Sequence, residues 1–180
     1  MRVITGTARG AKLIAPKGMQ TRPTADRVKE GLVSAIQLEI EGRRVLDLFA
    51  GSGQLGIEAL SRGAEYAVFV DRSADAIAAI RVNLEKTHLS DRSRVVRGDY
   101  QSFLSQTKER YDIIFLDPPY AENFQEKALK CISEIDILRQ GGIIICEKPR
   151  EKEIPDDLPG LIMQKEYRYG KVTLWLYRKV

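Results

Sequence analysis

The sequence is poor in the residues on which metal sites, disulfide frameworks and several hydrolytic sites depend. Its 180 residues include two cysteines and one histidine. Cys131 and Cys146 stand in apolar contexts without a CxxC partner, so we expect buried free thiols and no metal site. His88 lies in a polar stretch, and no glycine-flanked serine accompanies it, which argues against a Ser-His-Asp hydrolase.

Long apolar runs are also missing. The chain has no eighteen-residue hydrophobic stretch, no segment resembling a signal peptide and no internal repeat. Its hydrophobic residues (43%) and charged residues (30%) occur in the proportions of an ordinary globular protein. From this length and composition we expect one domain, a monomer located in the cytoplasm, without membrane contact.

Positive charge is concentrated at one end of the chain. The formal net charge is +4, yet residues 1–30 carry seven basic side chains against two acidic ones, so the remaining 150 residues sum to about −1. Such a concentration favours contact with a polyanion, although a solvated surface without a partner is the alternative. The basic residues are Arg2, Arg9, Lys12, Lys17, Arg22, Arg27 and Lys29.

Beyond residue 42, apolar strands alternate with amphipathic helices. Strand-like runs occur at 45–49, 67–70, 94–97, 112–116 and 143–147. Helical patterns occur at 54–61, 74–86, 102–106 and 124–135. This alternation predicts a Rossmann-like α/β fold, with a doubly wound, mostly parallel sheet and helices on both faces. The end of the chain differs, because a Gly-Lys turn predicts an antiparallel β-hairpin formed by 161–169 and 172–177.

The first 42 residues form an extension of that pattern. Short β segments at 2–5 and 12–15 flank a turn with glycines at both ends, which predicts a small basic hairpin. Thr24 is the expected N-cap of an amphipathic helix that runs to Ile40. We therefore expect a basic hairpin and helix in residues 1–42, attached to a Rossmann-like core of residues 43–180.

A glycine-rich loop follows the first strand of the core. The spacing Gly51-x-Gly53-x-x-Gly56 permits a tight turn and lets a ligand approach backbone N–H groups at a helix start. It satisfies the dinucleotide fingerprint, and Asp71 stands at the end of the next strand, where a carboxylate can bind ribose hydroxyls. NAD and an adenosyl-sulfonium cofactor both fit this pattern, and a helix-capping Asp71 is the structural alternative.

Two further carboxylates favour S-adenosylmethionine. Asp47 precedes the glycines at the strand end, where its negative charge would repel a pyrophosphate and suit a sulfonium or ammonium group. Asp99 offers an acceptor for the adenine amino group, and Tyr100 offers a ring to lie near the base. A simple turn in which Asp99 caps the following helix is the alternative.

The segment Asp117-Pro118-Pro119-Tyr120 follows the fourth strand. Prolines cannot donate to a sheet ladder, so the strand must stop there, at the edge where open α/β sheets bind ligands. Asp117 and the Pro118 carbonyl can accept the hydrogens of a planar amino group while Tyr120 covers its face. Alone, the segment could equally be a rigid turn. Beside the other carboxylates, it favours an amine methyltransferase over a hydride-transfer enzyme.

Several segments together carry a family resemblance. They are RVITGTARG at 2–10, TRPTADRVKE at 21–30, LDLFAGSG at 46–53, LGIEALSRG at 55–63, FVDR at 69–72 and LDPPY at 116–120. Over nearly the whole chain the sequence resembles the bacterial small-subunit (16S) ribosomal RNA guanine-N2 methyltransferases of the RsmD type. The glycine loop and the Asp-Pro-Pro-Tyr segment are shared by many amine methyltransferases, whereas their combination with the segment at 21–30 is much more specific.

The resemblance implies methyl transfer from S-adenosylmethionine to the N2 amine of a guanine in ribosomal RNA, free or in an assembling small subunit. The expected catalytic residues are Asp117, Pro118 and Tyr120. The expected cofactor-binding residues are Asp47, Phe49, Gly51, Gly53, Asp71, Arg72, Asp99 and Tyr100. The expected RNA-binding residues are Arg9, Lys12, Lys17, Arg22 and Arg27. Arg22 and Arg27 fit a phosphate, the cofactor carboxylate or a helix-face salt bridge equally well.

Alternative functions remain open at this point. The amine-holding chemistry is shared with DNA adenine-N6 and protein-amide methyltransferases. An NAD-dependent oxidoreductase would explain the glycine loop but not the Asp-Pro-Pro-Tyr segment. A noncatalytic RNA-binding module would explain the basic N-terminal region but would not need Asp117.

Overall fold

The computed structural model describes residues 1–19, 23–119, 123–147 and 158–180. Its strands are β1 (Arg44–Asp47), β2 (Tyr66–Asp71), β3 (Ser93–Arg97), β4 (Tyr111–Leu116), β5 (Leu138–Glu147), β6 (Leu161–Tyr169) and β7 (Val172–Lys179). Its α-helices are α1 (Pro23–Ala35), α2 (Gln54–Ser61), α3 (Ala74–Lys86), α4 (Tyr100–Gln106) and α5 (Phe124–Glu134). Two short 3₁₀ helices are η1 (Gln37–Glu39) and η2 (Ser90–Arg92).

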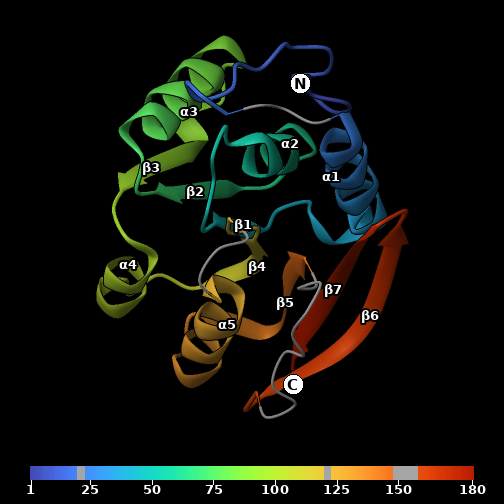
Figure 1. Ribbon diagram of the computed structural model, residues 1–180, viewed down its shortest axis with the longest axis vertical. Helices are drawn as coiled ribbons and strands as arrows, with labels where there is room; N and C mark the ends of the chain where they lie inside the picture. The colour runs from blue at the N-terminus through green and yellow to red at the C-terminus, as the bar shows by residue number, and fades with distance from the viewer. Residues whose placement is uncertain (20–22, 120–122, 148–157) are drawn as a thin grey trace.

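The strands form one seven-stranded sheet in the order β3-β2-β1-β4-β5-β7-β6 (Figure 1). The first five strands pair in parallel, and β7 is antiparallel to both β5 and β6. The predicted Rossmann-like sheet with a C-terminal antiparallel hairpin is therefore confirmed. The strand order reverses between β1 and β4, which is where open α/β sheets bind their ligands.

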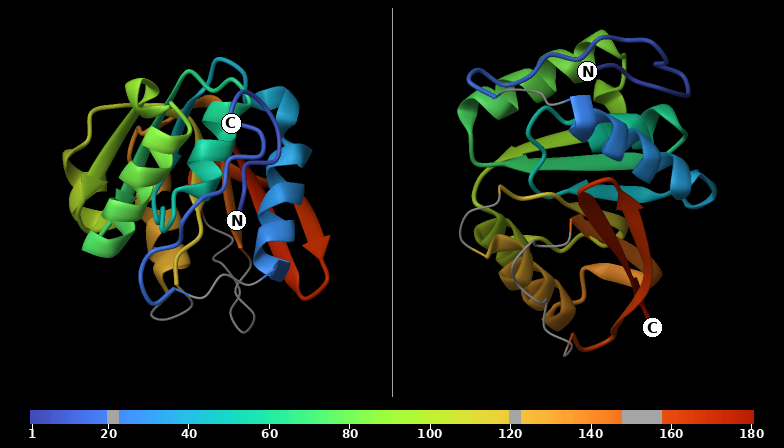
Figure 2. Two further views of the ribbon diagram at one scale, coloured as in Figure 1. Left: turned by 90° about the horizontal axis from the view of Figure 1, so that it is seen from above. Right: turned by 45° about the vertical axis from the view of Figure 1, so that its right-hand side comes forward.

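Helices cover both faces of the sheet (Figure 2). Side chains of α1, α2 and α3 share one hydrophobic cluster, whereas those of α4 and α5 belong to a second cluster on the other face. Strand β4 is buried along its whole length. Its residues alternate, with Ile113 and Phe115 in the first cluster and Ile114 and Leu116 in the second, because successive side chains of a strand point to opposite faces.

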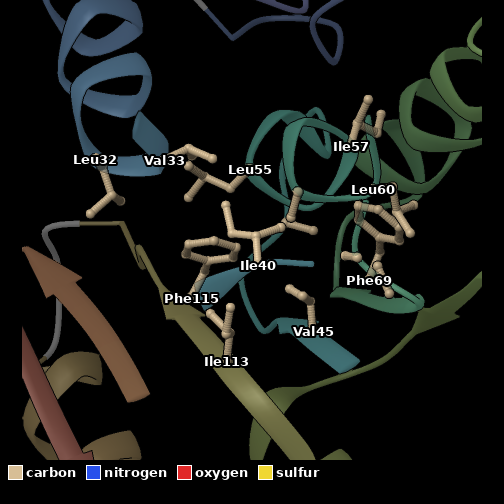
Figure 3. Close-up of a cluster of buried hydrophobic side chains, with 14 of the residues drawn as sticks. Leu32, Val33, Ile40, Val45, Leu55, Ile57, Leu60, Phe69, Ile113 and Phe115 are labelled. Atoms are coloured by element: carbon tan, nitrogen blue, oxygen red, sulfur yellow. The ribbon is translucent and has the colours of Figure 1, made fainter. Parts of the chain in front are cut away.

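The first cluster packs helix α1 against α2 and the sheet (Figure 3). Leu32 and Val33 of α1 lie near Leu55 of α2, above Phe115 of β4. Each large apolar side chain buried in this way contributes about 1.5–3 kcal/mol to stability. Replacing fully buried Phe115 by alanine would cost about 3–5 kcal/mol, because a cavity would remain. This packing sets the position of α1 above the carboxyl edge of β4.

The N-terminal segment forms much less β structure than its sequence predicts. A single antiparallel bridge, between Arg2 and Lys12, replaces the two expected strands. The reason is that the polar groups of this segment find partners on helices: the N–H groups of Ile4 and Thr5 donate to the Glu58 carboxylate at 2.9 and 3.1 Å. Side chains on α2 thus take the donors that a second strand would have needed.

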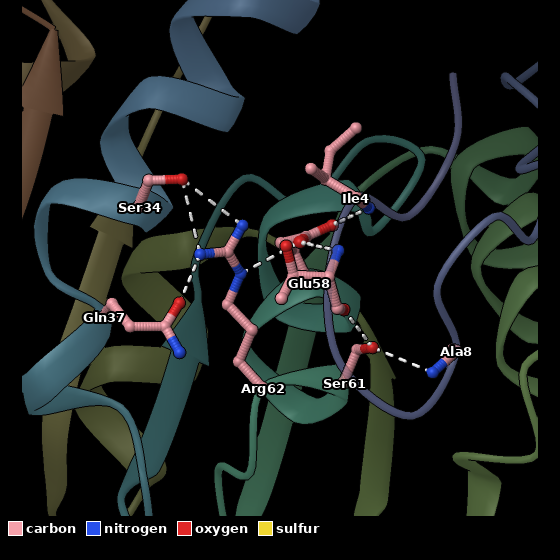
Figure 4. Close-up of polar contacts among 8 residues, drawn as sticks. Ile4, Ala8, Ser34, Gln37, Glu58, Ser61 and Arg62 are labelled. Atoms are coloured by element: carbon pink, nitrogen blue, oxygen red, sulfur yellow. Dashed lines mark hydrogen bonds and ion pairs between the residues drawn. The ribbon is translucent and has the colours of Figure 1, made fainter.

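A buried polar cluster joins this segment to α1 and α2 (Figure 4). Glu58 and Arg62 form an ion pair at 2.9 Å, with 5% and 2% of their side chains exposed. The Arg62 guanidinium also donates to Gln37 and Ser34 at 2.6 and 3.4 Å. A buried pair is tolerable only when its remaining hydrogen-bonding groups are satisfied, as they are here. Removing one partner would leave a buried charge and cost about 3–5 kcal/mol.

Several predicted element ends are wrong. Helix α1 begins at Pro23 instead of after a Thr24 cap, because proline suits the first helical position. The helix ends at Ala35, and the 3₁₀ helix η1 replaces its expected last turn. Strand β5 begins at Leu138, five residues earlier than the pattern predicts, because Leu138 pairs with Tyr111 across a register shift. A bulge of this kind is invisible to alternation alone.

The remaining sequence expectations concern cysteines, metals and membranes. Cys131 and Cys146 are free thiols, the second one buried. Within the described ranges, no group of three or more His, Cys, Asp or Glu side chains could hold a metal ion. None of the helices in those ranges is both long and apolar enough to cross a bilayer.

Candidate active site

The glycine loop between β1 and α2 has a conformation that requires its glycines. Gly51 and Gly53 have φ values of +57° and +79°, which L side chains rarely adopt. Gly56 stands close to β2, since an added Cβ would lie 2.3 Å from the Phe69 ring. The loop therefore turns tightly, and it presents the start of α2 to a ligand at the carboxyl edge of the sheet.

Asp71, at the end of β2, fixes this loop. Its Oδ2 accepts the N–H of Gly51 at 2.9 Å, and its Oδ1 accepts the N–H of Ser73 at 2.9 Å. The cap of α3 is Ser73, whose hydroxyl accepts the N–H of Ala76. Asp71 is therefore not the cap of this helix. Each carboxylate oxygen can accept a further hydrogen bond, so binding of ribose hydroxyls by Asp71 stays a prediction.

Asp47, at the end of β1, is almost completely buried. Only 2% of the residue is exposed, and its Oδ2 accepts the N–H of Gly56 at 3.2 Å. Burial raises the pKa of Asp47 to about 7, against the lowering effects of the Gly56 hydrogen bond and the Lys29 charge. The charges of Asp117 and Asp71 raise this pKa further. Three strand-end carboxylates and one lysine therefore act on each other at this edge.

Asp117 follows β4 and forms an ion pair with α1. Its Oδ2 lies 3.3 Å from Nζ of Lys29, and 34% of its side chain is exposed. Pro118 is buried and Pro119 is exposed, so the strand ends where the prolines predict. Tyr120 lies outside the described residues. Asp117 thus stands beside the strand-order reversal between β1 and β4, on the same edge as the glycine loop.

Lys29 is a site residue that sequence reasoning missed. It follows buried Val28 on α1. From the sequence, Lys29 was identified only as one of the basic residues of the N-terminal region. Its position inside the segment 21–30, which carries much of the family resemblance, was the available signal. The contact with Asp117 depends on how α1 packs on the sheet, and local sequence patterns do not contain that information.

Asp99 is the helix cap that the alternative interpretation predicted. Its Oδ2 accepts the N–H groups of Gln101 and Ser102 at 2.9 and 3.4 Å. Within the described part of the chain, its other oxygen has no hydrogen-bond donor, and the residue is exposed at the start of α4. Capping and binding of an adenine amino group are therefore compatible, and the second role stays a prediction.

An aromatic cluster lies next to Asp99. The Tyr100 ring is 5.2 Å from that of Phe49 and 5.8 Å from that of Phe124. Tyr100 is only 5% exposed, so it supports the half-buried Phe49 and leaves little of its own ring for a base. The Arg72 guanidinium lies over Phe124 at 5.9 Å. Sequence reasoning missed Phe124, although this residue opens the helix after the Asp-Pro-Pro-Tyr segment.

The predicted RNA-binding side chains point to solvent. Arg9, Lys12, Lys17 and Arg27 are exposed, and none forms an ion pair with another described residue. Among the described residues, Arg27 therefore has no partner for the helix-face salt bridge that was one of its predicted roles. Arg22 lies outside those residues. The segment approaches the glycine loop, since Met19 Cε would lie 3.4 Å from a Cβ at Gly51.

Comparison with known proteins places the chain in a family. Residues 1–178 match the family described as Conserved hypothetical protein 95. The chain belongs to this family. It is 42% identical to a candidate rRNA methyltransferase of Bacillus subtilis, YlbH, over 99% of both chains. It is 33% identical to Ribosomal RNA small subunit methyltransferase D of Escherichia coli, over 99% of this chain and 90% of that protein. The resemblance stated from the sequence is thereby confirmed.

Solved structures support the same placement. A candidate methyltransferase of Escherichia coli, yhhF, superimposes with a TM-score of 0.86 at 33% identity, covering 99% of this chain and 97% of that one. The Thermus thermophilus protein TTHA0928 gives a TM-score of 0.81 at 28% identity, with 98% of each chain covered. The fold of the family members thus extends over both the N-terminal segment and the core.

Proposed function

We propose that this protein transfers a methyl group from S-adenosylmethionine to the exocyclic N2 amine of a guanine in 16S ribosomal RNA. One observation carries the proposal. Asp117 and Pro118 lie at the end of β4, beside the glycine loop and the carboxylates of Asp47 and Asp71. The methyltransferase relatives named above support the reaction class. The cofactor of this chain is accordingly S-adenosylmethionine.

The donor set at the site fits this cofactor. The sheet edge carries the carboxylates of Asp47, Asp71 and Asp117, which attract a sulfonium and an ammonium group and repel a pyrophosphate. Asp71 stands where ribose hydroxyls are bound in related folds. Phe49 and Phe124 supply apolar ring surface beside Asp99. In an NAD-dependent oxidoreductase, the Asp47 carboxylate would face a phosphate, and the prolines after β4 would have no function in the reaction.

The chain's own residues position and deprotonate the amine. When bound, the cofactor supplies an electrophilic methyl group. The Asp117 carboxylate and the Pro118 carbonyl accept the two N–H groups of the base, which directs the nitrogen lone pair away from them. The amine would otherwise be a poor nucleophile, because its lone pair is delocalised into the ring. After transfer the nitrogen carries a surplus proton, and Asp117 is placed to accept it and pass it to water.

The substrate must be brought to this edge as an unstacked base. A guanine in folded RNA can reach Asp117 only when it is extruded from its stack. Exposed Arg9, Lys12, Lys17 and Arg27, together with Arg22, would bind phosphates. Tyr120 would stack on the extruded base. The choice of guanine follows the RsmD-type resemblance, since the same clamp would hold an adenine or amide nitrogen.

The test is a methylation assay with labelled S-adenosylmethionine. Undermethylated 16S RNA, free or assembled with ribosomal proteins, is incubated with the enzyme, digested and mapped by nucleoside analysis. Label in N2-methylguanosine is the expected result. Label in N6-methyladenosine would replace the guanine assignment, and label only in protein or DNA would overturn the proposed substrate.

A further inference from the structure

Lys29 occupies the acidic site although the proposed chemistry does not use it. Its ammonium nitrogen lies 3.3 Å from Oδ2 of Asp117, and its charge also acts on buried Asp47. The two side chains of the ion pair are 29% and 34% exposed, so the pair is neither fully solvated nor sealed from water. The carboxylate that the substrate amine must contact is therefore already bound to a cation.

A small cavity beside Lys29 offers the lysine a second position. Lys29, Glu30, Gln54 and Glu58 all line it. Gln54 opens helix α2 and is 8% exposed, and its Oε1 is buried without a hydrogen-bond partner among the described residues. An unpaired buried acceptor is unfavourable. A lysine ammonium brings three donors. Of the two lining glutamates, Glu58 is already paired with Arg62, so Glu30 supplies the negative charge that suits a lysine.

We propose that Lys29 is a displaceable counter-ion of the methyl-transfer site. In the cofactor-free protein it neutralises Asp117, and when the cationic cofactor binds it moves to Gln54 in the adjoining cavity. The inference rests on the proposed function, because it requires S-adenosylmethionine as the cofactor. Lys29 is thus a positioning residue that acts through Asp117.

The exchange follows from the charges of cofactor and product. S-adenosylmethionine carries one positive charge more than S-adenosylhomocysteine, which has lost the sulfonium. The cationic cofactor replaces Lys29 in the field of Asp47 and Asp117, whereas the product leaves that field uncompensated. Lys29 then returns to Asp117 and favours release of the product. Lys29 therefore reduces the ratio by which the site binds S-adenosylmethionine more tightly than S-adenosylhomocysteine. After the reaction it speeds the release of S-adenosylhomocysteine.

Calorimetric titration of both ligands into the purified protein tests the exchange. In Lys29→Met the ratio of the Kd for S-adenosylhomocysteine to the Kd for S-adenosylmethionine should rise about tenfold, because the competitor of the cation is gone. Lys29→Arg keeps the charge and should keep the ratio of the wild type. Lys29→Gln provides a second neutral variant, and circular dichroism checks that each variant is folded.

Other outcomes would contradict the inference in recognisable ways. An equal loss of affinity for both ligands would mean that Lys29 binds the carboxylate they share. Unchanged affinities with weaker RNA binding would mean that it binds phosphate. If the wild-type protein bound neither ligand, the proposed function itself would fail, and this result is distinct from a normal wild type with an unchanged ratio in Lys29→Met.

The receiving position has its own test. Gln54→Leu removes the acceptor, so the affinity for S-adenosylmethionine should fall several-fold while that for S-adenosylhomocysteine stays constant. In the Lys29→Met background the same substitution should have no effect, because no lysine remains to be received. An equal effect in both backgrounds would exclude Gln54 as the partner of the displaced lysine.

Discussion

At the residue scale, Asp117 combines a structural contact with the proposed catalytic role. It follows β4, lies 3.3 Å from Nζ of Lys29 and, in the proposed reaction, holds the substrate amine. Asp117→Ala should lower single-turnover methyl transfer by about 10²–10³-fold, because one preorganised acceptor is lost. Binding of S-adenosylmethionine, measured by calorimetry, should persist.

Asp99→Ala is the matched control for that substitution. It removes another strand-end carboxylate, which should weaken cofactor binding and leave turnover at saturating cofactor largely intact. Wild-type turnover by Asp117→Ala would remove Asp117 from the mechanism.

Asp47 gives cofactor binding a dependence on pH. Its pKa is raised to about 7, chiefly by burial, and only the ionised form attracts a sulfonium. The Kd for S-adenosylmethionine should therefore decrease as the pH rises through about 7, with a smaller decrease for S-adenosylhomocysteine. Calorimetry across this range measures the effect, and Asp47→Asn should flatten it. A wild-type profile as flat as that of the variant would contradict this assignment.

The same shift affects stability with a defined sign. Because the native pKa lies above the ordinary value of 3.8, the folded protein binds more protons than the unfolded chain between about pH 4 and pH 7. The contribution of Asp47 to stability is thus present at low pH and is lost as the pH rises through about 7. Urea unfolding of the wild type and of Asp47→Asn, each measured near pH 4 and above pH 7, isolates the contribution of Asp47 to the free energy of unfolding.

At the scale of elements, the N-terminal segment is held by α2 more than by its own hairpin. Gly6 has a φ of +89°, and an added Cβ would lie 1.8 Å from the carbonyl oxygen of Ser61. Gly10 has a similar φ of +83°, but nothing lies within 4 Å of a Cβ there. The two glycines therefore separate backbone strain from steric exclusion.

Alanine at these two positions should have different effects. Gly10→Ala should cost about 1 kcal/mol of unfolding free energy from the left-handed conformation alone. Gly6→Ala should cost more, because the segment must also move off α2. Urea denaturation gives both values, and equal losses would show that the close contact at Gly6 does not matter. Cofactor affinity should fall in Gly6→Ala only if the segment also helps to build the site.

The position of Lys29 is a property of element packing. Helix α1 approaches β6 closely at Gly31, where a Cβ would lie 2.6 Å from the Tyr169 ring. Three residues further along the helix, Ser34 accepts hydrogen bonds from Arg62 of the polar cluster. These contacts hold α1 between α2 and the C-terminal hairpin, and they place Lys29 over the end of β4.

At the scale of the whole molecule, the exposed basic side chains should determine RNA affinity. Reversing Arg9, Lys12 and Lys17 to glutamate should weaken RNA binding and reduce the slope of log K against log salt by about 2, if all three neutralise phosphates. Filter binding at several salt concentrations measures both quantities.

A matched triple reversal controls for total charge. Lys108, Lys127 and Lys130 are exposed and belong to the connection after α4 and to helix α5, on the other side of the sheet. Reversing them should leave the salt slope near that of the wild type. Equal effects of the two triple variants would place the RNA on neither surface in particular.

The alternation of apolar segments determined the fold class, because strands and helices differ in the period at which apolar residues recur. A strand–helix–strand order also predicts parallel strands joined by right-handed crossovers. It also located the glycine loop and the carboxylates of Asp47, Asp71 and Asp117, because in a parallel sheet every strand end lies on the same edge. This reasoning could find only side chains that stand at, or directly after, the end of a strand. The small N-terminal hairpin forms only in part, around the bridge between Arg2 and Lys12, because Glu58 and Ser61 compete for its backbone donors.

Tertiary structure alone decided the contacts between elements distant in sequence. Three features depend on the packing of a helix on the sheet. They are the pairing of Lys29 with Asp117, the buried state of Tyr100 and the Gln54 oxygen that has no partner among the described residues. Packing angles and the depth of burial arise from the sum of many apolar contacts, so no local pattern records them. The sequence by itself thus determined which strand-end groups reach the site, and the tertiary structure decided which side chains of the helices face them.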